Sequence, residues 1–142
     1  MIQSDGMTQK YVIGNWKLNP ATADEARSLA ASLHHQSQCV VGCAPSFVHT
    51  SIVKVALKDN VLLGAQDIAC KTGNTGSFTG DISAAQAADL GASFVLVGHS
   101  ERRQYHHESD DVFYQKMTHA FASGLSVIYC IGETKTQYDQ GA

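Results

Sequence analysis

Short apolar runs of strand length alternate along the chain with runs in which apolar residues recur at helical spacing. The apolar runs are nearly continuous, which is typical of strands that are buried on both faces of a parallel sheet. Helices between successive strands would cover such a sheet through right-handed crossovers. The sequence therefore predicts an α/β fold with five parallel strands, at residues 11–16, 38–44, 61–65, 94–98 and 125–131.

Four main helices are predicted between these strands. The first begins at Asn19-Pro20, because Asn accepts hydrogen bonds from free N–H groups and Pro suits a first turn. The second ends near Lys58, and the last two begin at the N-caps Ser83 and Ser109. Apolar residues at helical spacing form the faces expected to pack on the sheet: Ala23, Ala26, Leu29, Ala30 and Leu33; Val48, Ile52, Val55 and Ala56; Phe113, Met117, Ala120 and Phe121.

This order of elements fits two architectures, an open doubly wound sheet and a piece of a (β/α)8 barrel, and spacing alone does not decide between them. The third strand is followed by an unusually long polar stretch, residues 66–81. Connections of this length in a compact domain are usually functional or form an interface.

Composition narrows the class of protein. A chain of 142 residues suits one domain, and a net charge of −3 argues against a protein that binds the phosphate backbone of nucleic acid. No apolar run is long enough to span a bilayer, and the polar residues 1–10 are expected to be a frayed leader, not a secretory signal. We expect a cytoplasmic protein whose four cysteines are reduced, with no metal site.

Polar residues follow several of the predicted strands at their carboxyl ends, where ligands collect in parallel α/β folds. They are Asn15 and Lys17, Gln66, His99, Ser100 and Glu101, and Glu133. A lysine, a histidine and a glutamate on one rim suit a small anionic substrate. In the alternative interpretation Lys17 only pairs with Glu101, and His99 is a satisfied polar residue without a catalytic role.

Five strings in this chain resemble the triosephosphate isomerase family. They are Gly14-Asn15-Trp16-Lys17-Leu18-Asn19, Gly64-Ala65-Gln66, Ser77-Phe78-Thr79-Gly80-Asp81-Ile82-Ser83, Gly98-His99-Ser100-Glu101-Arg102-Arg103 and Cys130-Ile131-Gly132-Glu133. They occur in the family's order and at its spacing from residue 11 onwards. The resemblance implies the barrel, so that residues 11–142 would form the N-terminal part of one incomplete (β/α)8 TIM barrel.

The resemblance also implies roles for individual residues. Lys17 would hold the substrate phosphate and stabilise the enediolate oxygen, and Asn15 would line the same pocket. His99 would polarise the substrate carbonyl, with Glu101 and Ser100 supporting the site.

Thr79 and Gln66 would belong to the interface of the family's homodimer. The reaction would interconvert dihydroxyacetone phosphate and glyceraldehyde 3-phosphate, a step of glycolysis and gluconeogenesis, without a cofactor.

A full barrel needs about 250 residues, so the resemblance covers only its first five strands. The family's general-base glutamate falls in the remainder, and Glu133 does not replace it. We therefore expect the chain to be inactive alone and to need the missing C-terminal half or to associate with itself. The alternative is a non-catalytic binding or self-associating fragment.

Overall fold

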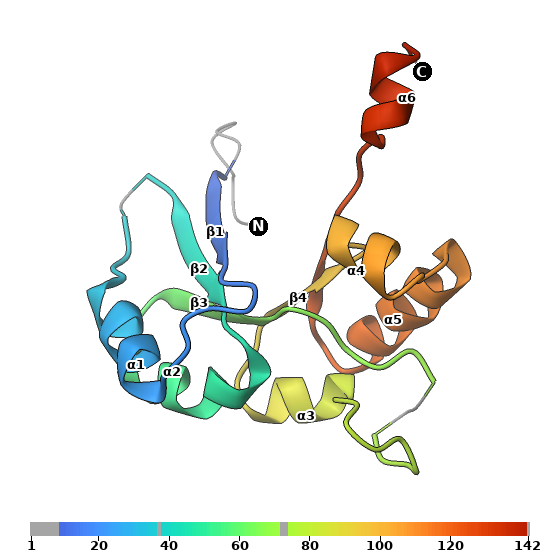
Figure 1. The fold of residues 1–142 in the computed structure, drawn as a ribbon. Coiled ribbons are helices and arrows are strands. Elements are labelled where there is room, and N and C mark those ends of the chain that lie inside the picture. The colour runs from blue at the N-terminus through green and yellow to red at the C-terminus, as the bar shows by residue number, and fades with distance from the viewer. Residues whose placement is uncertain (1–8, 37, 72–73, 142) are drawn as a thin grey trace, which may run out of the picture.

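The computed structural model describes residues 9–36, 38–71 and 74–141. Its five parallel strands lie side by side in the order β1-β2-β3-β4-β5, which is also their order along the chain. With every crossover in the same direction, right-handed connections place the helices on one face of the sheet. Figure 1 shows α1, α2, α3 and α5 along the outside of this curved sheet. The barrel is therefore confirmed over the doubly wound sheet, as an open part of a (β/α)8 barrel.

The strands lie where the apolar runs predict them, and all but β3 are shorter than predicted at one end or both. They are β1 (Tyr11–Asn15), β2 (Val40–Ala44), β3 (Val61–Ala65), β4 (Phe94–Val97) and β5 (Ser126–Tyr129). The predicted leader at residues 1–10 falls almost wholly outside the described residues. Within them, the carbonyl of Lys10 accepts a hydrogen bond from the N–H of Val40 at 2.8 Å.

The four predicted helices are present, together with two short ones that the sequence did not indicate. The helices are α1 (Ala23–Ser32), α2 (Thr50–Ala56), α3 (Ala84–Asp89), α4 (Ser100–Tyr105), α5 (Asp110–Ala122) and α6 (Lys135–Asp139), and a 3₁₀ turn (Phe47–His49) precedes α2. The unexpected α4 and α6 are only six and five residues long. In so short a helix, apolar periodicity has no room to repeat.

The predicted start of the first helix at Asn19-Pro20 is wrong. The helix begins at Ala23, where the hydroxyl of Thr22 accepts a hydrogen bond from the N–H of Glu25 and the Glu25 carboxylate accepts one from the N–H of Thr22. This reciprocal capping box satisfies two free donors at once, which an Asn-Pro start could not do. Ser83 caps α3 in the same way. Ser109 stands at the N-cap of α5 but makes no side-chain hydrogen bond there.

Apolar side chains between helices and sheet form two clusters on the outer face. Cys43, Val53 and Leu63 are buried beneath α1 and α2 with Ala26 and Ala30. The second cluster lies beneath α3 and α5 and includes Val95, Val97, Phe113, Ala120 and Leu125.

All three predicted helix faces are wrong in part. On α1, Ala23 and Leu29 are exposed, and only Ala26 and Ala30 are buried. Val48 and Val55 are exposed, because α2 turns Val53 and Thr50 inward instead. On α5 Phe121 is exposed, and Lys116 takes a buried position beside Phe113.

The concave face of the sheet carries a third cluster, of Ala44, Phe94 and Leu96, with Ile13 and Leu62 beside it. Gly64 makes this packing possible, since a Cβ there would lie 2.2 Å from the ring of Phe94. A hollow of about 530 Å³ opens over this face, lined mainly by residues of β1, β3, β4 and β5.

The two edge strands of the sheet, β1 and β5, are more exposed than the inner strand β4. All four residues of β4 are buried, whereas β1 and β5 have no residue in the buried class. In the described part of the chain, β1 pairs with β2 alone and β5 with β4 alone. Among the described residues, no helix has the length and the apolar character that crossing a membrane requires.

Candidate active site

Lys17 lies in the turn that follows β1, where hydrogen bonds to its main-chain N–H and carbonyl hold it in place. Its φ of +53° lies in the left-handed region, where a residue with a side chain is strained. The Asn15 Oδ1 atom accepts a hydrogen bond from the Lys17 N–H at 2.9 Å, and Gln66 Nε2 donates to the Lys17 carbonyl at 2.8 Å. The ends of β1 and β3 thus fix the base of the lysine side chain.

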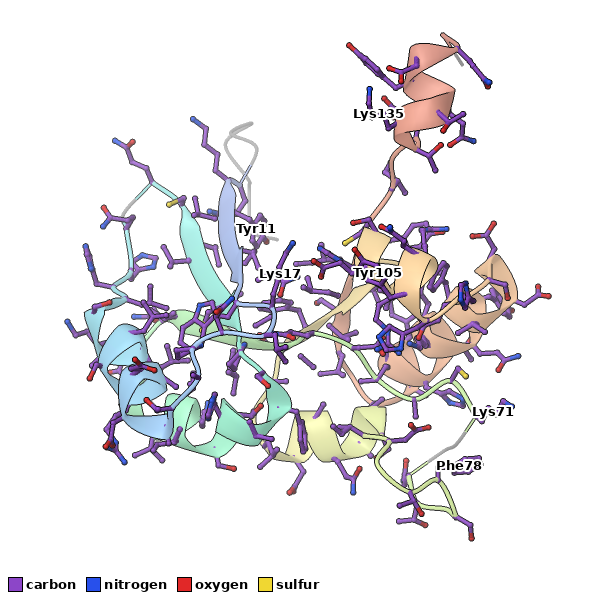
Figure 2. All side chains as sticks on the ribbon, viewed as in Figure 1. Tyr11, Lys17, Lys71, Phe78, Tyr105 and Lys135 are labelled. Atoms are coloured by element: carbon purple, nitrogen blue, oxygen red, sulfur yellow. The ribbon has the colours of Figure 1, made fainter. Side chains whose placement is uncertain are left out.

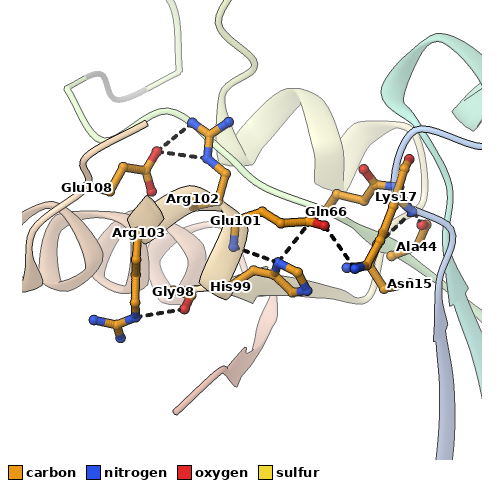
Figure 3. A network of polar contacts seen from close by, with 10 residues as sticks. All are labelled: Asn15, Lys17, Ala44, Gln66, Gly98, His99, Glu101, Arg102, Arg103 and Glu108. Atoms are coloured by element: carbon orange, nitrogen blue, oxygen red, sulfur yellow. Dashed lines mark hydrogen bonds and ion pairs between the residues drawn. The ribbon is translucent and has the colours of Figure 1, made fainter. Parts of the chain in front are cut away.

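One carboxylate connects Lys17 with His99 (Figure 3). Lys17 Nζ donates to Glu101 Oε1 at 2.9 Å, and Glu101 Oε2 lies 3.4 Å from His99 Nδ1. The hydrogen bond from Lys17, with its positive charge, holds the pKa of Glu101 below its ordinary value. The Lys17 and Glu101 side chains are 51% and 44% exposed, so water screens this ion pair and it adds little to stability. The Glu101 carboxylate therefore lies beside both the Lys17 ammonium and the His99 ring.

The hydrogen bonds of His99 define which ring nitrogen faces outward. His99 is the N-cap of α4, and its Nδ1 accepts a hydrogen bond from the N–H of Glu101 at 3.3 Å. Because a backbone N–H can only donate, Nδ1 is the acceptor and a neutral ring carries its proton on Nε2. Nε2–H is thus the ring donor left for a ligand. Ser100 is the first residue of α4 and is exposed.

Gln66 and Thr79, the two residues expected at a subunit interface, have different surroundings in this chain. The Gln66 amide donates to the carbonyls of Lys17 and Ala44, the latter at 2.9 Å, so that it ties the first two strand ends together. Thr79 is an exposed turn residue in the long loop after β3. Figure 2 shows its neighbour Phe78 at the outer tip of this loop, far from the rest of the rim.

Behind the rim lies a network of four charged side chains that the sequence did not indicate. Lys116 Nζ donates to Asp67 Oδ1 at 2.6 Å and to Glu108 Oε1 at 2.7 Å. Arg102 binds the same two carboxylates. The signal was present in the sequence, since Lys116 stands on the helix face between Phe113 and Ala120 where an apolar residue is expected.

Burial and pairing act in opposite directions on the two carboxylates of this network. Burial raises the pKa of Asp67 above its ordinary value, although Lys116 and Arg102 oppose it. Burial also acts to raise the pKa of Glu108, but the hydrogen bonds and charges of Arg102 and Lys116 outweigh it and hold that pKa below its ordinary value. The network fixes Arg102, and with it α4, against the start of the long loop.

No group of three or more metal-ligating side chains is found in the part of the chain that the structure describes. The cysteines are all free, and burial raises the pKa of Cys43 to about 12, which keeps this thiol protonated and unreactive. The groups that the rim does present are an ammonium and an imidazole N–H. Both are suited to hold negative charge on a substrate oxygen or phosphate.

Comparisons with known proteins agree with this arrangement. A model of the triosephosphate isomerase family matches residues 10–142. The triosephosphate isomerase of Psychrobacter arcticus is 46% identical over 92% of this chain, and that of Vibrio cholerae is 38% identical over 95%. The chain spans about half the length of these relatives, 54% in both cases. On this match and on its fold, the chain belongs to the triosephosphate isomerase family.

Proposed function

We propose that this chain forms the N-terminal part of an enzyme that interconverts dihydroxyacetone phosphate and glyceraldehyde 3-phosphate. The observation that carries the proposal is the single carboxylate of Glu101, which lies within 3.4 Å of both Lys17 and His99. The proposal places the chain in cytoplasmic glycolysis and gluconeogenesis. It requires no cofactor, because acid–base groups and electrostatics suffice for moving a proton beside a carbonyl.

In this reaction a base removes a proton from the carbon beside the substrate carbonyl, and the bonding electron pair forms an enediolate. His99 Nε2–H donates to the carbonyl oxygen as negative charge develops on it. The Lys17 ammonium stabilises the same charge and attracts the phosphate, and Asn15 holds the lysine main chain. His99 moves the hydroxyl proton from one enediolate oxygen to the other, and return of a proton to the neighbouring carbon completes the isomerisation.

The general base is proposed to come from outside the 142 residues, in the part of the relatives that this chain does not cover. The carboxylate of Glu101 is engaged by Lys17 and cannot serve as a free base. A missing general base alone lowers the rate by about 10²–10⁴-fold. The isolated chain is therefore expected to be inactive.

Two associations are part of the proposal. A C-terminal portion would cover the apolar hollow of the concave face and pair with the open edges of β1 and β5. In the completed enzyme, a homodimer would use the exposed loop that carries Thr79, together with Leu18, which is 90% exposed beside Lys17.

Complementation tests this proposal. The chain is mixed with the C-terminal portion of the Psychrobacter arcticus relative, and isomerase activity is measured for each part alone and for the mixture. Activity is expected only in the mixture. Lys17→Ala should raise KM strongly and His99→Gln should mainly lower kcat, whereas Lys135→Ala, which removes an exposed lysine from α6, should change neither. Full activity of both site variants would refute the assignment of the site.

The second candidate function is a non-catalytic fragment that binds to another copy of itself. It is favoured by the same apolar hollow and open strand edges, which an unassembled chain leaves uncovered. Sedimentation of the purified chain distinguishes the two functions. A stable homo-oligomer that neither dissociates nor gains activity with the C-terminal portion would favour this candidate.

A further inference from the structure

The side chain of Arg103 occupies the junction between the carboxyl ends of β4 and β5. It leaves α4 and returns to the strand that precedes His99, where Arg103 Nε donates to the Gly98 carbonyl at 3.0 Å (Figure 3). Arg103 Nη2 donates to the hydroxyl of Tyr129 at 3.0 Å and lies 3.4 Å from the Cys130 carbonyl. One guanidinium thus connects the ends of β4 and β5 with α4, the helix whose N-cap is His99.

Two aromatic rings hold this guanidinium in place. Arg103 Cζ lies 4.3 Å from the ring centroid of Phe113 and 5.7 Å from that of Tyr129. The two rings are tilted by 60° with their centroids 6.2 Å apart. Phe113 is fully buried, so the cation rests on a fixed apolar surface, and Asp110 accepts a further hydrogen bond at 3.1 Å.

The backbone that Arg103 grips is the one that sets the direction of His99. Gly98 has a φ of +76°, and a Cβ at this position would lie 2.8 Å from the Tyr129 ring and 3.1 Å from Arg103 Nη2. The Gly98 carbonyl belongs to the peptide plane that leads into His99. Beyond His99, its own carbonyl accepts a hydrogen bond from the N–H of Arg102 at 2.8 Å, the first bond of α4.

We propose that Arg103, with Tyr129 as its partner, is a positioning residue for His99, which it holds through the Gly98 carbonyl. Arg103 does not itself touch substrate. Its guanidinium fixes the peptide before His99, so that Nδ1 accepts the N–H of Glu101 and Nε2 is left to carry the ring proton. This inference rests on the proposed function, because it assigns the support of the histidine that would polarise the substrate carbonyl.

The test begins with the chain alone and needs no turnover. In wild type, the ¹⁵N shifts of the His99 ring in its neutral form should report a proton on Nε2, with Nδ1 as acceptor. Arg103→Met should replace them with the averaged shifts of a ring that exchanges between tautomers, and Tyr129→Phe, which keeps the ring and removes the hydroxyl, should move them part of the way. Arg27→Met and Tyr114→Phe remove an exposed arginine and an exposed tyrosine hydroxyl elsewhere and should leave the shifts unchanged.

Kinetics of the complemented enzyme give the second readout. Arg103→Met should lower kcat by about 10²-fold with KM near the wild-type value, as expected when a catalytic group is misplaced. Arg103→Lys should recover part of the loss, because an ammonium can reach one of the carbonyls.

The outcomes separate the two proposals. An inactive wild-type mixture would count against the proposed function, while the ring shifts would still decide the role of Arg103. If the Arg103→Met variant folds and its His99 ring has the same ¹⁵N shifts as in wild type, the inference is overturned. If that variant does not fold by circular dichroism, wild-type shifts in Tyr129→Phe overturn it.

Discussion

The side chain of Lys116 is only 3% exposed, and its ammonium lies between Asp67 and Glu108. A buried cation is tolerated only when it is paired, and here two cations meet two carboxylates. The Glu108 side chain is nearly as deep, at 9% exposed, and its Oε2 has no hydrogen-bond partner among the described residues. Helical periodicity could not predict this network, because periodicity gives which face is buried and not what pairs with it there.

Glu108→Gln tests the charge of this network. At neutral pH the variant should be less stable by about 3 kcal/mol, because Lys116 and Arg102 lose one of their two anions. The pKa of Glu108 is lowered in the folded chain, so its charge stabilises the fold above the unfolded pKa. This stabilisation is lost as the pH falls through the folded pKa.

Urea unfolding of Glu108→Gln and of wild type across acidic to neutral pH measures the gap in unfolding free energy. The two curves should converge at low pH. Glu101 titrates in both proteins and does not contribute to the difference, whereas Asp67 contributes to it because the charge of Glu108 helps to raise the pKa of Asp67. A gap that stays constant with pH would show that volume or geometry, and not charge, separates them.

An aromatic ring of β4 packs against a glycine of the neighbouring strand β3. Phe94 of β4 pairs with Gly64 of β3, and its ring lies where a side chain at position 64 would be. Phe94 is 3% exposed, so its ring fills the space that the missing side chain of Gly64 leaves. The strands themselves could be predicted from their apolar runs. The inward direction of α2 could not, because its exposed Val55 is as apolar as its buried Val53.

Gly64→Ala should destabilise the chain by about 1–3 kcal/mol, because the new methyl group overlaps the Phe94 ring and one strand must shift. Gly14→Ala in β1 is the matched control, since its Cβ would meet nothing closer than 3.6 Å. Denaturant midpoints measure both. Adding Phe94→Leu to Gly64→Ala should recover part of the loss, and a purely additive double variant would contradict the ring contact.

The whole molecule is an open sheet whose centre is better protected than its edges. Its inner strands are covered by helices on the outer face and by apolar side chains on the concave face. The rim residues Lys17, Glu101 and His99 lie on the first and fourth strand connections, and the curvature of the sheet brings them together. Their proximity follows from parallel strands that end on one rim, which is why the sequence could predict it. The role of Arg103 could not be predicted, because it depends on a side chain that folds back from α4.

Hydrogen exchange should show this gradient directly. Amide protons of β3 and β4 that bond to a neighbouring strand should exchange most slowly, and those of β1 and β5 faster, because an edge strand opens without disturbing the sheet between them. Adding the C-terminal portion of a relative should slow exchange in β1 and β5 far more than in β3, since the added strands would cover both edges. Two-dimensional NMR of amide exchange measures each strand separately. Equal protection in all five strands of the isolated chain would mean that the edges are already covered, and the copy that covers them would then be detected as a dimer by sedimentation.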